Sequence, residues 1–411
     1  MRTGEKKWLA SMAAGSGRRI ESALRLFFFL CLVGIHAHPA FAAAGLVVPP
    51  PPPTLFSLEQ LRDMMDSRTR TGVGFDSIPA LMRPEFLSVS DASLSMEHDE
   101  QVFIVEYPTG LVRIYPQRIM VWHEVVNDVL PDPGGAVVRK DTPLSALDGF
   151  TITYCPITGS VSAFYSMAGR YPSSFGVTGE LYNSNTLLYD RATRSTWSQL
   201  TATCIDGPLI NKRLSRIQVL WSSWKGAMAR YPDAQVLSRS TGYNRSYGRD
   251  PYGSYLRAGN YYDDLRILFP IARNDNRLPP KKRILGLEIE GIFGAVDKQV
   301  VRDARVVNMT LGLTPLVAVY DQVLGAVRVF DARVEGLDTS LQFEIFENKL
   351  IDTETRSEWD DEGNCVYGRL RGKKLAPMYS MDSMWFAWAA FYPQTIILPE
   401  AEFVRQTPGE W

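Results

Sequence analysis

The sequence DRATRSTW occupies residues 190–197 and returns as DTETRSEW at residues 352–359. Five of the eight positions are identical. The similarity continues in the same order through a cysteine, a glycine, a tryptophan and a Tyr-Pro pair, which are Cys204, Gly207, Trp224, Tyr231 and Pro232 in the first stretch and Cys365, Gly368, Trp385, Tyr392 and Pro393 in the second. A repeat of this length with so many matches indicates a duplicated supersecondary unit.

Short strands and short helices alternate in both copies. In the first copy, two apolar runs flank the turn Pro108–Gly110 and predict a hairpin, and Pro116 then opens a short helix. The predicted helices cover residues 58–65, with Ser57 as N-cap, and then 117–126, 221–231, 302–307 and 385–392. We therefore expect an α+β fold made of two tandem related copies of a mostly antiparallel strand unit with short helices.

The length of 411 residues is sufficient for two ordinary cores. We expect five regions, namely a signal peptide at 1–42, a Pro-rich spacer at 43–57, a first repeat domain at 58–237, an inter-repeat segment at 238–283 and a second, degenerate repeat domain at 284–400. The inter-repeat segment is rich in Tyr, Gly, Arg and Asp and is too long for an ordinary connection. It is therefore expected to wrap one domain or to border a site.

The N-terminus has the features of an export signal. Basic residues precede the apolar run Leu26–Ile35, and Ala40-Phe41-Ala42 forms a small-x-small cleavage site. The run is too short to span a bilayer comfortably, so we expect cleavage and a periplasmic or secreted protein, with a retained membrane anchor as the alternative. No other apolar stretch is long enough to span a membrane, so no membrane span is expected once the signal is removed.

Charge and composition exclude one class of partner. An apolar content of 45% is typical of a globular protein and not of a disordered one. Residues 1–42 hold six Lys or Arg and two Asp or Glu, which leaves 38 basic and 43 acidic residues in the rest of the chain. A slightly acidic surface offers no electrostatic reason to bind nucleic acid.

Three cysteines remain after signal removal, namely Cys155, Cys204 and Cys365. An odd number in an exported protein leaves at least one thiol unpaired within the chain. Cys204 and Cys365 hold equivalent places in the two copies, so they could meet near a pseudo-two-fold axis and form a disulfide. The alternative is that both are small buried thiols.

His123 and Cys155 are the candidate reactive residues. His123 lies in the predicted helix at 117–126 and shares its inward face with Asn127, four residues on, and Cys155 begins the turn after the next strand. In a first hypothesis the two side chains bind a transition metal, with copper or zinc favoured by the ligand types. In a second, Cys155 is a nucleophile or redox thiol whose pKa His123 lowers. In a third, both are structural. His98 lies in a polar stretch and is expected to be exposed.

The second copy lacks both reactive groups. Ala304 stands opposite His123, Arg305 opposite Glu124, and Asp321 opposite Cys155. This pattern indicates one working half and one supporting half, although neutral drift in a structural protein would produce it too. The tryptophans that recur in both copies are expected to fill the cores. They are Trp197, Trp224, Trp359 and Trp385.

Several short motifs of this chain resemble those of a known family. These motifs are HExxND at 123–128, TYCPxxGS at 153–160, FGVxG at 175–179, LYNSN at 181–185, YDR at 189–191, TWSQ at 196–199, RDPY at 249–252 and RLP at 277–279. Together they resemble the domain of unknown function family 3179 of bacteria and archaea, over about residues 102–397. The resemblance implies no particular reaction. It implies pocket or supporting roles for the motif residues Glu124, Asn127, Asn183 and Asp190. Members often carry a second cysteine where this chain has Thr158, which argues against a dithiol redox role.

The leading functional hypothesis from the sequence is a binding protein with a His123/Cys155 metal site in the first repeat. The alternatives are an extracytoplasmic enzyme that uses Cys155 as nucleophile and His123 as base, and an interaction module without chemistry. The sequence predicts a small molecule or a metal as ligand and no particular oligomeric state.

Overall fold

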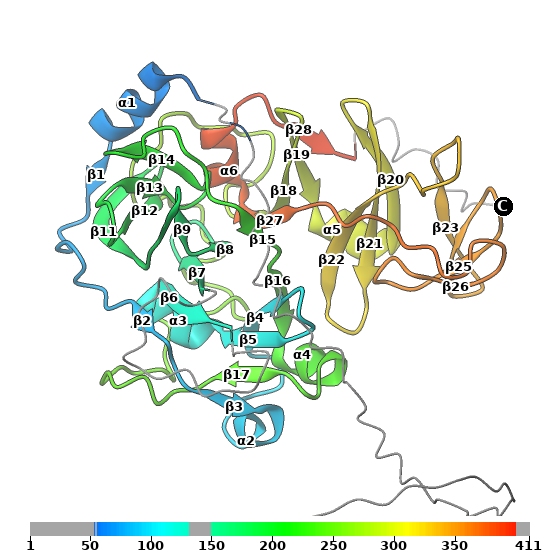
Figure 1. Cartoon of the computed structure of the whole chain (residues 1–411), viewed down its shortest axis with the longest axis horizontal. Helices are drawn as coiled ribbons and strands as arrows, with labels where there is room; N and C mark the ends of the chain where they lie inside the picture. The colour runs from blue at the N-terminus through cyan, green and yellow to red at the C-terminus, as the bar shows by residue number, and fades with distance from the viewer. Residues whose placement is uncertain (1–52, 54–55, 131–148, 400–411) are drawn as a thin grey trace, which may run out of the picture. The chain divides into compact units, whose positions relative to one another are not determined.

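The computed structural model describes Pro53, residues 56–130 and residues 149–399 (Figure 1). The predicted signal peptide at 1–42 and most of the Pro-rich spacer lie outside the described residues. In the part of the chain that is described, no helix is long and apolar enough to cross a membrane. All described residues belong to the unit Gly45–Trp411.

Helix α1 (Leu58–Asp66) begins where the sequence predicts. The Ser57 side chain accepts a hydrogen bond from the backbone of Gln60, and the Gln60 side chain accepts one from the backbone of Ser57. This reciprocal cap satisfies two backbone donors at the start of the helix. Leu61 and Met64 are buried on the inner face of α1, which confirms both the helix and its predicted N-cap.

Three five-stranded sheets are built mainly from residues 69–237. One has the order β16-β4-β5-β17-β3, made of Leu220–Ser223, Gln101–Glu106, Val112–Pro116, Gln235–Leu237 and Phe86–Ser88. Another has the order β15-β8-β7-β6-β2, made of Arg216–Ile217, Ser160–Tyr165, Gly149–Cys155, Val125–Val129 and Leu81–Met82. The third has the order β1-β11-β12-β13-β14, made of Thr69–Arg70, Phe175–Tyr182, Asn185–Asp190, Thr196–Ser198 and Thr203–Asp206. The antiparallel pair β4–β5 confirms the predicted hairpin.

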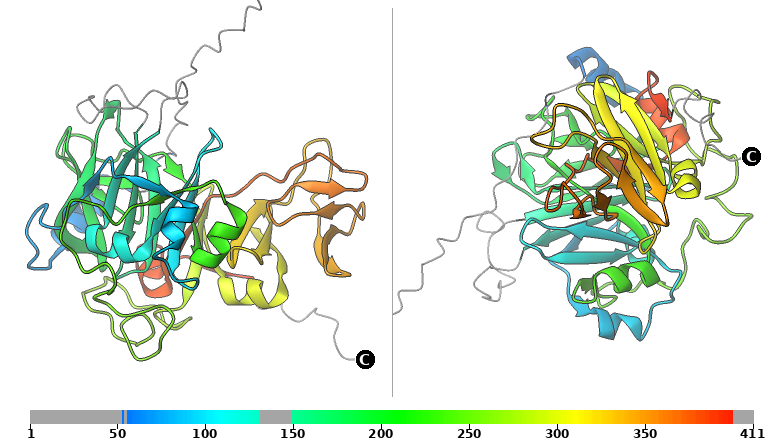
Figure 2. Two further views of the ribbon diagram at one scale, coloured as in Figure 1. Left: turned by 90° about the horizontal axis from the view of Figure 1, so that it is seen from below. Right: turned by 90° about the vertical axis from the view of Figure 1, so that its right-hand side faces the viewer.

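Three further sheets are built from residues 283–398, and Figure 2 shows two of them, β20–β22 in yellow and β23–β26 in orange, as separate sheets. The order β27-β18-β19-β28 joins Ser380–Met384, Arg283–Ile289, Ile292–Asp297 and Ile396–Leu398. The order β20-β21-β22 joins Val306–Leu311, Thr314–Asp321 and Ala326–Asp331. The order β23-β24-β25-β26 joins Phe343–Phe346, Lys349–Asp352, Glu358–Trp359 and Cys365–Tyr367. A small hairpin of β9 (Met167–Ala168) and β10 (Tyr171–Pro172) completes the strands of the described residues.

The described residues contain six short helices among these strands, so the expected mixed α and β content is confirmed. Besides α1 they are α2 (Val89–Ser93), α3 (Gln117–His123), α4 (Trp224–Arg230), α5 (Lys298–Ala304) and α6 (Trp385–Phe391).

Three predicted helix boundaries need correction. The helix predicted at 117–126 ends at His123, because Glu124 adopts a left-handed φ of 55° and strand β6 follows at once. Every residue of β6 is buried, so in the sequence the apolar residues of this strand look like a continuation of the helix. The helix predicted from residue 221 begins at 224, and the one predicted at 302–307 is α5, which begins where the Asp297 side chain caps it.

The recurring tryptophans fill the cores as predicted, since Trp197, Trp224, Trp359 and Trp385 are all at most 3% exposed. The alternative of a disulfide between Cys204 and Cys365 is not borne out, because both thiols are free. Cys204 is buried in the cluster around Trp197, and Cys365 is buried in a separate cluster around Trp359. Equivalent positions therefore lie in different cores and do not meet.

Candidate functional site

The turn between α3 and β6 positions the side chains of the predicted site. Glu124 occupies this turn with a φ of 55°, and its carbonyl accepts a hydrogen bond from the backbone of Tyr154 at 2.8 Å. Arg305 occupies the turn between α5 and β20 with a φ of 67°, and its carbonyl accepts from Tyr320 at 2.8 Å. Because the same backbone geometry holds a glutamate in one place and an arginine in the other, the left-handed turn belongs to the fold and not to one reaction.

His123 is held as a neutral imidazole by protein partners. Its Nδ1 lies 2.7 Å from the carbonyl oxygen of Pro79, which can only accept, so Nδ1 carries the proton. Its Nε2 lies 2.6 Å from the hydroxyl of Tyr247 and accepts from it. Burial lowers the pKa of His123, which favours this neutral form. Both ring nitrogens are therefore occupied, whereas His98 is exposed as predicted.

Cys155 ends β7 with its side chain 1% exposed. Its sulfur lies 3.9 Å from the carbonyl oxygen of Ser184. Burial and, after it, the nearby Glu124 carboxylate raise the pKa of the Cys155 thiol to about 11. The resting group is therefore a protected thiol and not a thiolate.

Glu124 is the titratable neighbour of that thiol. Burial raises the pKa of Glu124 to about 7, and a hydrogen bond from the Thr186 hydroxyl at 3.3 Å is the one contact that lowers it. No arginine or lysine of the described residues forms an ion pair with this carboxylate. Glu124 can therefore gain or lose a proton near neutral pH beside Cys155.

The structure gives His123 and Cys155 different partners, so it does not bring them together as a metal-binding or acid–base pair. A metal on His123 would have to displace Tyr247, and one on Cys155 would have to remove a proton held with a pKa of about 11. Within the described ranges, no three His, Cys, Asp or Glu side chains gather as ligands. The donor groups present therefore do not fit the copper or zinc site that the sequence suggested.

A buried polar network lies behind Cys155. The side-chain amide of Asn185 donates to the hydroxyls of Thr158 and Ser160, at 3.0 Å each, and to the side-chain oxygen of Gln199 at 2.8 Å. Gln199 in turn donates to the hydroxyl of Thr153 at 3.1 Å. The Thr158 side chain also bonds the sulfur of Cys155, which counteracts part of the rise in its pKa. Thr158 is thus a hydroxyl neighbour of the thiol.

Tyrosines of the segment 238–283 cover the thiol. Cys155 shares an apolar cluster with Tyr261 and Tyr262, and Tyr252 packs against the same cluster. The Tyr261 hydroxyl donates to the carbonyl oxygen of Ile157 at 2.6 Å, which fixes the segment over the turn that follows Cys155. Burial raises the pKa of Tyr252, and the nearby Glu124 and Cys155 add to this rise. The segment predicted to wrap a domain or border a site thus lies over this site.

A cleft of about 670 Å³ is lined in part by residues 247–250 and 253–258 of the same segment. Tyr255, Asp250 and Gln117 contribute to its wall. The Gln117 amide donates to Asp250 at 2.7 Å and to the hydroxyl of Tyr154 at 3.3 Å, so the cleft wall is tied to the residue just before Cys155. The sequence did not predict this cleft wall, because Gln117 and Asp250 are more than a hundred residues apart in the chain.

Asn127 has a structural role that the sequence did not reveal. Its side chain accepts from the backbone of Phe175 at 2.7 Å and donates to the carbonyl of the same residue at 2.8 Å, which ties β6 to β11. Asn308 makes the same two bonds to Phe343, at 2.9 Å and 2.8 Å, between β20 and β23. Because both halves of the chain use this clip, the asparagine supports the fold and not the site.

Asn183 and Asp190 are structural as well. The Asn183 side chain accepts from the backbone of Ala272 at 2.7 Å and donates to the carbonyl of Ala390 at 3.3 Å. Asp190 accepts from the indole of Trp197 at 3.0 Å, and Asp352 accepts from Trp359 at 3.0 Å in the same turn. Of the pocket residues implied by the resemblance, Glu124 alone lies beside the thiol.

Comparison with known families agrees with the motifs. A family model described as "Protein of unknown function (DUF3179)" matches residues 75–395. The chain belongs to this family. The DUF3179 match confirms the resemblance that the motifs indicated. It includes Glu124, Cys155, the tyrosines that cover the thiol, and most of the second half of the chain. Neither a curated protein nor a solved structure matches the chain.

Proposed function

We propose that this DUF3179 protein carries a thiol site in which Cys155 is the nucleophile and Glu124 is its proton acceptor. The observation that supports it is a buried carboxyl without a cationic partner, titrating near neutral pH beside a buried thiol. Unpaired buried carboxyls destabilise a fold, so their presence needs a compensating role. The fold itself does not require one here, because Arg305 occupies the equivalent turn.

The chemistry follows from the proton affinities of the two groups. At neutral pH a fraction of Glu124 is ionised, while Cys155 keeps its proton. As the sulfur attacks an electrophilic carbon or sulfur atom of a substrate, the Glu124 carboxylate takes the thiol proton. The bond from the attacked atom to its leaving group breaks, and Glu124 returns that proton to the leaving group. His123 takes no part in these steps and orients the end of α3 through Pro79 and Tyr247.

We further propose that the chain is a tandem duplication with one working half, residues 58–237, and one supporting half, residues 284–400. Three observations support this. The orders β16-β4-β5-β17 and β27-β18-β19-β28 agree, as do β8-β7-β6 and β22-β21-β20. The Asn127 and Asn308 clips are alike. In place of Cys155 the second half has Asp321, which forms an ion pair with Arg230 of α4 at 3.0 Å.

Export remains a proposal that rests on the sequence of residues 1–42, with a periplasmic or secreted site of action. A site covered by tyrosines suits such a compartment, because a buried thiol is shielded from oxidants.

Two small thiol-directed probes test the proposed site, one with an electrophilic carbon (iodoacetamide) and one with an electrophilic sulfur (methyl methanethiosulfonate). Mass spectrometry of the peptide that contains Cys155 measures the rate of labelling in wild type, Glu124→Gln and His123→Gln. We expect Glu124→Gln to slow labelling about tenfold or more near neutral pH, within the usual range for loss of a general base. His123→Gln is expected to label at the wild-type rate. Equal rates in wild type and Glu124→Gln would overturn the proposal.

A further inference from the structure

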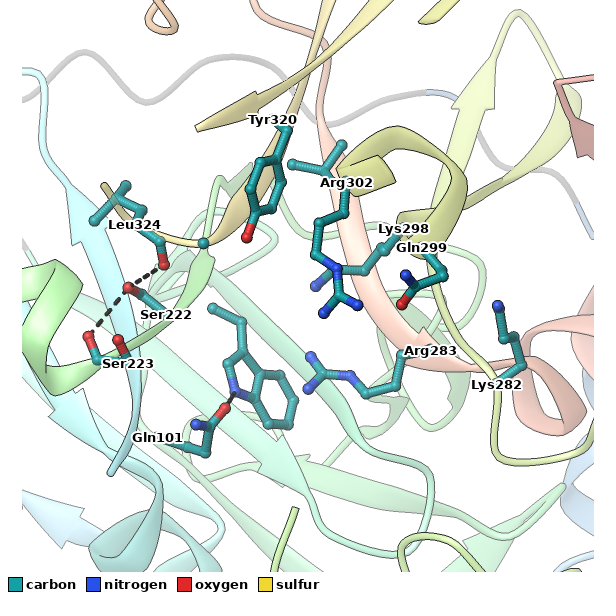
Figure 3. Close-up of a pocket in the computed structure, with 13 residues that line it drawn as sticks. Gln101, Ser222, Ser223, Lys282, Arg283, Lys298, Gln299, Arg302, Tyr320 and Leu324 are labelled. Atoms are coloured by element: carbon teal, nitrogen blue, oxygen red, sulfur yellow. Dashed lines mark hydrogen bonds between the residues drawn. The ribbon is translucent and has the colours of Figure 1, made fainter. Parts of the chain in front are cut away.

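A second cavity, of about 380 Å³, lies away from the thiol and is lined by residues of β16, β18, α5 and β21. Four cationic side chains line it, namely Lys282, Arg283, Lys298 and Arg302. Among the described residues, no Asp or Glu contributes to its wall. Figure 3 shows the guanidinium groups of Arg283 and Arg302 directed into the same space. The cavity is thus strongly cationic.

Arg283 is fixed in place with one donor unused. Its guanidinium lies 3.5 Å from the centre of the Trp221 ring, and Trp221 is itself anchored by a hydrogen bond to Gln101 at 2.9 Å. One terminal nitrogen donates to Asp382 at 2.6 Å. The Nε atom is buried and has no hydrogen-bond partner.

Asp382 has to balance two cations. It forms ion pairs with both Arg283 and Lys298 through the same oxygen atom. The Lys298 side chain is 16% exposed, and its partial burial lowers the pKa of the ammonium group to about 8. One carboxylate between two cations leaves one positive charge without a carboxylate partner at the cavity wall.

The remaining cations have carboxylate partners outside the cavity wall. Lys282 pairs with Asp297 at 3.0 Å. Arg302 lies 3.7 Å from Asp303, and both side chains are more than half exposed, so this contact is weak. Arg302 therefore remains available to a ligand at the mouth of the cavity. The hydroxyl of Tyr320 and the amides of Gln101 and Gln299 add neutral hydrogen-bonding groups to the wall.

We propose that this cavity binds a phosphate group, held by Arg283, Lys298 and Arg302. The planar donor fork of a guanidinium matches the oxygens of a phosphate, and Arg283 and Arg302 direct two such groups into the cavity. A negatively charged ligand would also compensate the charge that Asp382 leaves unbalanced. The volume suits a small molecule. The inference stands apart from the proposed thiol chemistry, because none of the cavity residues contacts Cys155 in the described structure.

Isothermal titration calorimetry with sodium phosphate at low ionic strength tests the proposal, and sodium chloride at matched ionic strength is the salt control. The variants are Arg302→Gln and Lys298→Met. Arg333→Gln is the matched control, because Arg333 is an exposed arginine paired with Asp331. We expect saturable phosphate binding in wild type and Arg333→Gln, weakened about tenfold or more in Arg302→Gln and Lys298→Met.

The removal of the exposed Arg302 side chain is not expected to affect folding, so this variant decides the test even where Lys298→Met fails to fold. No saturable binding in the wild type would overturn the proposal, as would equal weakening by Arg302→Gln and Arg333→Gln. A parallel titration with glycerol phosphate separates two sources of the group. Tighter binding of the ester would support a phosphorylated small molecule, and tighter binding of the free ion would support inorganic phosphate.

Discussion

Replacing Glu124 by Gln should stabilise the protein at alkaline pH and leave its stability nearly unchanged at acid pH. Burial raises the pKa of Glu124 from 4.5 to about 7. Because the folded state holds this proton more tightly than the unfolded state, folding stability falls as pH rises from 4.5 to 7. Each pKa unit corresponds to about 1.4 kcal/mol, so the ionised carboxyl costs the folded state about 3 kcal/mol above pH 7. Glutamine has nearly the shape of the protonated acid and, like it, a hydrogen-bond donor. Because glutamine does not ionise, it avoids the cost of a buried charge.

The assay is urea unfolding of wild type and Glu124→Gln at about pH 4.5, 6 and 8, with the difference in unfolding free energy as the readout. That difference should grow in favour of the variant by about 2–3 kcal/mol across the series. Glu335→Gln is the matched control, because Glu335 is exposed, and it should show no such trend. A difference between wild type and Glu124→Gln that is the same at every pH would refute the argument that Glu124 is buried without compensation.

Four other substitutions probe other parts of the structure. Asn127→Ala and Asn308→Ala should each reduce the free energy of unfolding by about 1–3 kcal/mol, because each removes two backbone-directed hydrogen bonds; a loss in urea unfolding from Asn127→Ala alone would contradict the matched clips. Tyr252→Ala should speed labelling of Cys155 by iodoacetamide by uncovering it, and an unchanged rate would remove Tyr252 from the cover. Burial lowers the pKa of His123, so the folded state loses stability as pH falls through 6.5. The melting temperature of the wild type should therefore fall between about pH 7 and 5, and that of His123→Gln should fall less. An equal fall in both proteins would contradict the neutral state of His123.

Much of the fold could be predicted from local patterns. The hairpin of β4 and β5, the cap of α1 and the buried tryptophans follow from turn residues, an N-cap and apolar spacing, which act over a few residues. The end of α3 could not be predicted, because the strand that follows is buried on both faces and its apolar residues continue the helical pattern. Tertiary contacts, and not local propensity, decide where that helix stops.

The candidate site was predicted in part. The sequence identified Cys155 and the short helix before it, but it paired the thiol with His123 instead of Glu124. His123 ends the helix and Glu124 adopts a left-handed φ, so the two side chains point in different directions. No local sequence pattern predicts a left-handed φ at a glutamate. The covering tyrosines were visible only as a tyrosine-rich segment, since their contact with Cys155 joins residues about a hundred positions apart.

The central claim is that Glu124 and Cys155 exchange a proton, and ¹³C NMR of protein labelled at Glu and Cys tests it most directly. The account predicts that the Glu124 carboxyl signal titrates with a midpoint near pH 7, consistent with a pKa raised by burial to about 7. It also predicts that the Cβ signal of Cys155 shifts at the same midpoint and that this shift is lost in Glu124→Gln. A Glu124 midpoint near 4.5, together with a Cys155 signal that neither moves through neutral pH nor responds to Glu124→Gln, would contradict the account.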